Sequence, residues 1–101
     1  MWWLRDKDRN EFRLDDETWA HILEFHPEIA NVELVESILR DPDQVVRSNW
    51  DSQCILYYKQ IAPRRFRAVV VQLTEKRIKT TLTTDKVKRG EMLWVKEKPI
   101  F

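Results

Sequence analysis

Two histidines, His21 and His26, lie within the stretch 19–28, and their side chains titrate near neutral pH. An imidazole near its pKa can accept or release a proton during a reaction. Five residues apart on a helix, the two rings lie about 140° apart around the axis, so they cannot share a metal ion as an i, i+4 pair would. The chemistry they favour is acid–base catalysis without a metal. The structural alternative is a surface or capping role, which fits His26 best because Pro27 follows it.

Basic side chains are concentrated in the second half of the chain. Residues 59–89 contain ten basic and two acidic side chains, whereas residues 1–58 contain six basic and thirteen acidic ones, and the net charge is +1. This segregation predicts a basic face for an acidic partner, most simply nucleic acid. A solvated sheet face is the alternative. The expected contacts are Lys59, Arg64, Arg65, Arg67 and Lys79.

Length and composition limit the other functions. A chain of 101 residues fits one domain, residues 1–101, and its 43% hydrophobic fraction can form a core without disulfides or a structural metal. Cys54 is the single cysteine, and no apolar run is as long as a membrane span or resembles a signal peptide, so we expect a cytoplasmic protein without a membrane partner. Gly90 is the single glycine, which excludes glycine-rich phosphate loops. We expect no cofactor.

Hydrophobic periodicity predicts two helices. The first covers about 16–26, with Trp19, Ile22, Leu23 and Phe25 as its buried stripe, and ends before Pro27. The second follows an Asn31 cap and continues to the break at 41–43.

Four strands are predicted after the helices, at 44–48, 54–61, 66–73 and 77–84. Residues 92–95 could add a short last strand, residues 1–4 form a short strand or a packed arm, and residues 12–14 alternate as in a brief strand. Because no βαβ rhythm is present, the predicted class is α+β: two N-terminal helices packed on a mostly antiparallel four-stranded sheet.

Several short motifs occur together in this order. They are Trp19-x-His21-Ile22, His26-Pro27-Glu28, Pro42-Asp43-x-Val45, Tyr57-Tyr58-Lys59, Val69-Val70-Val71 and Thr80-Thr81-Leu82-Thr83-Thr84. Together they resemble small phage-associated domains of the barnase, EndoU, colicin and RelE-like (BECR-fold) superfamily of ribonucleases. The resemblance covers most of residues 19–94. It implies a metal-independent endoribonuclease, with RNA as substrate, and a toxin or mobile-element effector with an antitoxin or immunity protein as partner.

The resemblance also implies roles for individual residues. It puts the general acid or base on His21 or His26, phosphate contacts on Lys59 and Arg67, and a hydroxyl contact on Thr80 or its neighbours. Tyr57 or Tyr58 could stack a base, although adjacent strand residues point to opposite faces. We favour His21 over His26, because packing in mid-helix can fix its rotamer.

A different class of function is a catalytically inactive module of the same fold that binds nucleic acid or protein, such as a toxin–antitoxin component. Trp2 and Trp3 would then mark a contact surface or a dimer interface. The sequence leaves open the oligomeric state, the RNA target and which histidine leads.

Overall fold

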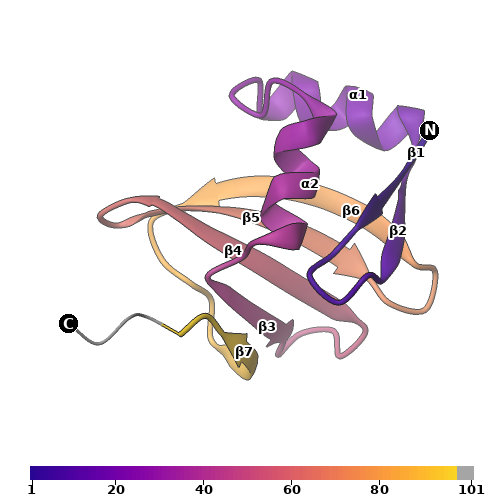
Figure 1. The fold of residues 1–101 in the computed structure, drawn as a ribbon. Coiled ribbons are helices and arrows are strands. Elements are labelled where there is room, and N and C mark those ends of the chain that lie inside the picture. Colours follow the sequence, from indigo (N-terminus) through magenta and orange to yellow (C-terminus); the bar gives the residue numbers. More distant parts are fainter. Residues whose placement is uncertain (98–101) are drawn as a thin grey trace.

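The structure is a computed structural model that describes residues 1–97. Its elements are β1 (Trp2–Arg5), β2 (Glu11–Leu14), α1 (Asp16–Phe25), α2 (Val32–Arg40), β3 (Gln44–Ser48), β4 (Cys54–Ala62), β5 (Arg65–Gln72), β6 (Arg77–Thr84) and β7 (Gly90–Val95). All strands join one sheet in the order β1-β2-β6-β5-β4-β3-β7, and both helices lie on one face of it (Figure 1). The predicted fold class is therefore wrong: the sheet is mixed and seven-stranded, and a hairpin precedes the helices.

The N-terminal hairpin of β1 and β2 is the first reason for this difference. Its strands pair antiparallel, with Leu4 opposite Phe12, and both of these side chains are buried. β2 then pairs parallel with β6 at Arg13 and Arg77, where Arg13 N–H donates to the Lys76 carbonyl over 2.8 Å. Each strand has four residues, too few for alternation to show that the two strands pair with each other or that β2 joins the distant β6.

The last strand, β7, is the second reason. It pairs antiparallel with β3 and ends beside Asp43, whose carbonyl accepts from Lys96 N–H over 2.9 Å. A Cβ at Gly90 would lie 2.2 Å from the Arg47 carbonyl oxygen, so only glycine permits this approach. The described strand thereby extends the sheet beyond β3.

The helices follow their predicted ranges but not all of their predicted packing. In α2, the Asn31 side chain accepts from Leu34 N–H over 2.9 Å, and the buried residues are Val35, Ile38 and Leu39. In α1 only Ile22 is buried, and the expected burial of Leu23 and Phe25 is wrong because they are 38% and 60% exposed. α1 therefore contacts the sheet along a narrow stripe. No helix in residues 1–97 is long and apolar enough to cross a membrane.

The four central strands divide their side chains between two cores. Tyr57, Val69 and Ile78 face the helices, whereas Leu56, Tyr58 and Ala68 form a second cluster on the other face. Successive strand residues alternate in this way, so each strand position belongs to one face. This alternation decides which polar side chains can meet.

Candidate active site

Five side chains form a row on the helix-covered face, from β4 to the loop after α1. Lys59 is paired with Arg67 across β4 and β5, and Arg67 with Thr83 across β5 and β6. Paired residues have Cβ atoms roughly 5 Å apart on the same face. Thr83 Oγ1 lies 3.2 Å from Glu28 Oε1, and the same Glu28 oxygen lies 3.4 Å from His26 Nδ1. We call these five residues the His26–Lys59 row.

The loop after α1 positions the histidine end of the row. Pro27 ends the helix, and His26 N–H still donates to the Ile22 carbonyl over 2.7 Å. Ile29, which is fully buried, donates from its N–H to the His26 carbonyl over 3.0 Å. Glu28 is thereby fixed between a buried residue and the helix end. The side chains of His26 and Glu28 keep 29% and 39% of their surface exposed, so a ligand can reach them.

The carboxylate of Glu28 is held in its ionised form. A hydrogen bond from its own backbone N–H lowers the pKa of Glu28. Burial opposes this effect in part, and the Thr83 hydroxyl and His26 then lower the pKa further. An ionised carboxylate beside Nδ1 favours the proton on that nitrogen and leaves Nε2 for proton transfer.

The two cations of the row differ in their partners. Lys59 Nζ lies 3.2 Å from Asp41 Oδ2 and 3.7 Å from Asp43 Oδ1. Arg67 has no carboxylate partner within the described 97 residues, and its Nε is buried without a hydrogen-bond partner there. Arg67 is therefore the cation of the row that a phosphate can engage without displacing a protein carboxylate.

His21 does not join this row. Its side chain is exposed, and its ring packs against Phe25 with centroids 4.5 Å apart and the ring planes tilted by 46°. It lines a separate cavity of about 310 Å³ together with Arg77 and Lys79. Both cations are engaged elsewhere, because Arg77 Nε lies 2.6 Å from Glu75 Oε2 and Lys79 Nζ lies 3.9 Å from Cys54 Sγ. The geometry thus favours His26, against the sequence-based preference for His21.

Three other predicted contacts point away from the row. Thr80 pairs with Val70 and its hydroxyl donates to the Thr81 carbonyl, so the hydroxyl contact expected there falls to Thr83 instead. Tyr58 is fully buried on the other face, where its hydroxyl accepts from Lys88 N–H. The expectation that Lys79 shares a basic face with Lys59 and Arg67 is wrong, because Lys79 Nζ approaches Cys54 Sγ on the opposite face. Alternation and the β6 bulge direct Tyr58 and Thr80 to that face as well.

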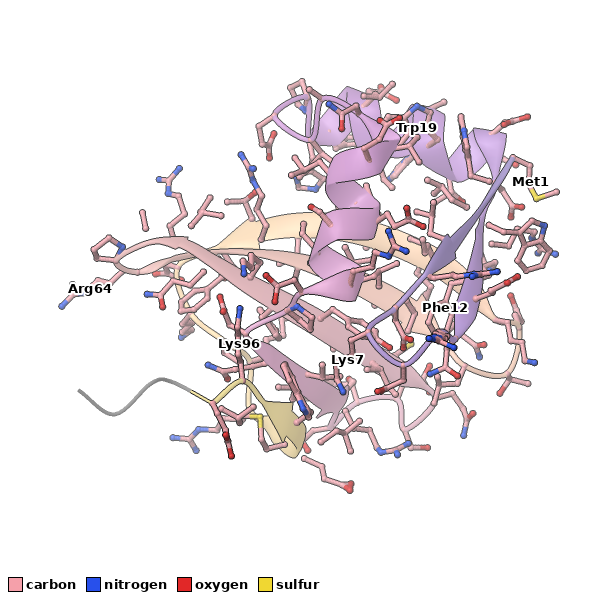
Figure 2. All side chains as sticks on the ribbon, in the orientation of Figure 1. Met1, Lys7, Phe12, Trp19, Arg64 and Lys96 are labelled. Atoms are coloured by element: carbon pink, nitrogen blue, oxygen red, sulfur yellow. The ribbon has the colours of Figure 1, made fainter. Side chains whose placement is uncertain are left out.

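The remaining predicted cations lie beyond Lys59 at the β4–β5 hairpin. Arg64 occupies its tip with a φ of 57° and projects outward (Figure 2). Arg65 begins β5 two residues before Arg67, so alternation places it on the same face as the row. Arg65 extends the positively charged end of the row beyond Lys59, whereas Arg64 lies at the margin of that end.

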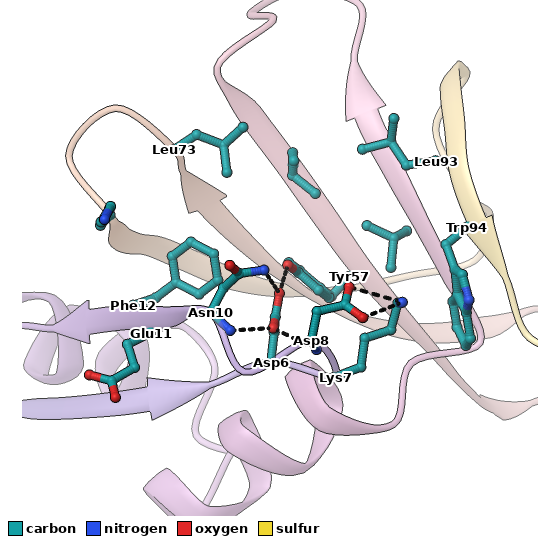
Figure 3. Close-up of a pocket in the computed structure, with 13 residues that line it drawn as sticks. Asp6, Lys7, Asp8, Asn10, Glu11, Phe12, Tyr57, Leu73, Leu93 and Trp94 are labelled. Atoms are coloured by element: carbon teal, nitrogen blue, oxygen red, sulfur yellow. Dashed lines mark hydrogen bonds and ion pairs between the residues drawn. The ribbon is translucent and has the colours of Figure 1, made fainter.

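A second candidate is a cavity of about 340 Å³ under the β1–β2 turn (Figure 3). Its buried carboxylate, Asp6, accepts hydrogen bonds from the N–H groups of Asp8 and Asn10, the Asn10 side chain and the Tyr57 hydroxyl, the last over 2.6 Å. Burial and then Asp6 raise the pKa of Tyr57 well above its ordinary value. The Tyr57 hydroxyl therefore keeps its proton at neutral pH, and the four hydrogen bonds to Asp6 hold the β1–β2 turn in place.

Sequence reasoning missed two members of the row, Glu28 and Thr83. Glu28 belongs to the His-Pro-Glu motif and Thr83 to the threonine-rich strand, so both residues stand in motifs that the sequence shows. Nothing in the sequence shows that these two motifs, 55 residues apart, come into contact.

In residues 1–97 no group of three or more His, Cys, Asp or Glu side chains could hold a metal ion.

Comparisons with known proteins do not assign this chain to a family. No protein-family model matches the chain, and no curated protein or solved structure is significantly similar to it.

Proposed function

We propose that this chain binds RNA at the His26–Lys59 row and cleaves it without a metal. The observation that carries the proposal is the row itself: an imidazole held by a carboxylate, a hydroxyl, and a guanidinium without a carboxylate partner among residues 1–97 lie together on the helix-covered side of the sheet. The imidazole supplies the general base and the guanidinium the fixed positive charge that cleavage by the 2′-hydroxyl of RNA requires, and the hydroxyl holds the carboxylate that lies beside the imidazole.

Each group has a distinct task in the proposed reaction. His26 Nε2 takes the proton of the 2′-hydroxyl, whose oxygen attacks the adjacent phosphorus. The bond to the 5′-oxygen breaks, that oxygen takes a proton from solvent, and a 2′,3′-cyclic phosphate remains. Arg67 stabilises the negative charge of the phosphorane, and Glu28 orients His26. Proton transfer contributes roughly 10² to 10⁴-fold, and a fixed charge of this kind contributes roughly 10² to 10³-fold.

The proposed setting is the cytoplasm, where a free buried thiol such as that of Cys54 is stable in the reduced state. An antitoxin or immunity protein as partner stays a prediction.

The test is incubation of purified protein with labelled RNA in EDTA. We expect fragments that end in a 2′,3′-cyclic phosphate, identified by their mass and by resistance to phosphatase until acid opens the ring. Fragments with a 3′-hydroxyl would contradict the mechanism. Absence of cleavage over a broad RNA set, with binding retained, would replace it with the alternative of a catalytically inactive binding module.

A further inference from the structure

A cavity of about 410 Å³ lies between the β1–β2 turn and the C-terminal end of α2. Figure 1 shows the turn, an indigo loop, next to this end of the helix. Lys7 N–H donates to the Leu39 carbonyl over 3.0 Å, which ties the turn to the helix. Arg5 N–H donates to Glu36 Oε2 over 3.1 Å and adds a second tie. Four of the five residues that line the cavity are cations: Arg5, Asp6, Lys7, Arg9 and Arg40.

The carboxylate in this lining, Asp6, is already engaged by hydrogen bonds. Its Oδ1 accepts from the N–H groups of Asp8 and Asn10, and its Oδ2 accepts from the Asn10 side chain and the Tyr57 hydroxyl. Each oxygen thus has two donors, which is as many as a carboxylate oxygen usually accepts. Asp6 therefore holds the turn rigid, and the turn in turn positions Arg9.

Two of the four cations have close carboxylate partners outside the lining. Arg5 Nη2 lies 3.2 Å from Glu11 Oε1, and Lys7 Nζ lies 3.1 Å from Asp8 Oδ2. These pairs neutralise much of the charge of Arg5 and Lys7.

The other two cations, Arg9 and Arg40, keep their guanidinium groups open to a ligand. Arg40 Nη1 lies 4.0 Å from Glu36 Oε1, which is longer than a hydrogen bond, and the Arg40 side chain is 62% exposed. Arg9 is exposed, and the ion pairs found in residues 1–97 do not include it. An anion can therefore bind both groups without displacing a close protein carboxylate.

The backbone of Arg9 is a further indication of a ligand. Its φ of 67° lies in the left-handed region, which favours glycine because a Cβ is crowded there. The turn bond from Arg9 N–H to the Asp6 carbonyl, 3.1 Å long, would form equally with glycine. The local backbone thus gives no reason for an arginine, and its guanidinium forms no ion pair in the described part of the chain. Binding of an external anion is the contribution that this side chain can make.

The arrangement of the two arginines selects the kind of anion. Arg9 belongs to the turn and Arg40 to the helix, so two guanidinium groups reach one cavity from different elements. A carboxylate has two oxygens and satisfies one guanidinium fork, whereas a tetrahedral phosphate has enough oxygens for two forks.

We propose that this cavity binds a phosphate group between Arg9 and Arg40. The group belongs either to a small ligand or to a nucleic acid strand, since the recognition chemistry is the same. The lining shares no residue with the His26–Lys59 row, so the inference does not depend on the proposed function.

The test is a titration of ¹⁵N-labelled protein with inorganic phosphate at constant ionic strength, followed by NMR. The amide signals of Asp8 and Asn10 should shift in a saturable way, because both residues belong to the turn beside the ligand. We expect Arg9→Gly and Arg40→Gln each to weaken binding about tenfold, because each removes a charge-assisted hydrogen bond. Arg9→Gly keeps the backbone N–H and suits the left-handed conformation, so its melting temperature should equal or exceed that of wild type.

Lys76→Gly is the matched control for the loss of a positive charge. Lys76 is also exposed, has a φ of 51° and does not line this cavity, so the variant should bind phosphate as wild type does. Absence of saturable shifts in wild type, shifts confined to signals outside the turn, or unchanged affinity in both folded arginine variants would overturn the inference. An equal loss of affinity in Lys76→Gly would overturn it too, since binding would then follow net charge.

A second titration, with single-stranded oligothymidylate, distinguishes the two sources of the phosphate. DNA lacks the 2′-hydroxyl, so this probe stays intact even if the protein cleaves RNA as proposed. Shifts of the same two amides with both probes would support a site for strand phosphates. Shifts with inorganic phosphate alone would support a site for a small phosphate-bearing ligand.

Discussion

Thr83 Oγ1 donates to Glu28 Oε1 over 3.2 Å, which joins the middle of the sheet to the loop that ends α1. This contact brings His26 and Arg67 onto one surface, although 40 residues separate them in the sequence. The acid–base group and the phosphate-binding group would otherwise belong to independent elements.

Glu28→Gln should make the stability of the protein less sensitive to acid. The pKa of Glu28 is lowered in the folded state, so its stabilising contribution is complete above the ordinary value of 4.5 and is lost as pH falls through the folded value. The residue is partly exposed, so we expect a difference below about 1 kcal/mol between pH 7 and pH 3. Urea unfolding at both pH values measures it, and a steeper loss in the variant than in wild type would contradict this account.

Arg67→Gln should reduce the salt dependence of RNA binding. One phosphate contact to a single strand contributes roughly 0.7 to the slope of log K against log salt. Lys79→Gln is the matched control, because Lys79 approaches Cys54 on the opposite face and should leave the slope unchanged. A slope that falls in the Lys79 variant but not in the Arg67 variant would move the binding surface to the other face.

Thr81→Val should stabilise the protein. Thr81 is fully buried, and its hydroxyl has no hydrogen-bond partner among the described residues. Removing an unsatisfied hydroxyl at nearly constant shape should raise the free energy of unfolding by about 1 kcal/mol. Thr83→Val, which loses the contact with Glu28, should not be stabilised. Thermal melts compare the two, and destabilisation by Thr81→Val would show that its hydroxyl is satisfied in solution.

Tyr57→Phe should destabilise the β1–β2 turn. The variant removes one of the four hydrogen bonds to the buried Asp6 carboxylate. We expect a loss of roughly 1.5 to 3 kcal/mol in the free energy of unfolding, because a bond to a charged group is lost. RNA cleavage per folded molecule should remain as in wild type. Unchanged stability of the variant would show that the hydrogen bond from Tyr57 to Asp6 does not stabilise the turn.

The four central strands were predictable from sequence because they are long and rich in β-branched residues. The ranges 44–48 and 77–84 match β3 and β6, the range 54–61 ends one residue before β4 does, and the range 66–73 is shifted by one residue from β5. The patterns of β1 and β2 were weaker. The pairing of β2 with β6 joins Arg13 to Arg77, 64 positions apart, and depends on packing that no local pattern encodes.

Site geometry was less predictable than strand position. A bulge in β6 falls where Val70 opposes Thr80 and Val71 opposes Ile78, and the face of each threonine depends on the register on both sides of it. The sequence therefore identified a threonine-rich strand but selected Thr80 over Thr83. His21 looked better than His26 for a similar reason, since nothing local shows that α1 buries only Ile22 against the sheet.

The central claim is that His26, held by Glu28, transfers the proton in metal-free RNA cleavage. The most direct measurement compares His26→Ala with His21→Ala on labelled RNA in EDTA, with thermal melts of both variants. The two histidines lie five residues apart in the sequence, but only His26 belongs to the row, whereas the His21 ring packs against Phe25. We predict that folded His26→Ala loses activity by roughly 10² to 10⁴-fold while His21→Ala cuts as wild type. Normal cleavage by folded His26→Ala, or a selective loss in His21→Ala, would contradict the account.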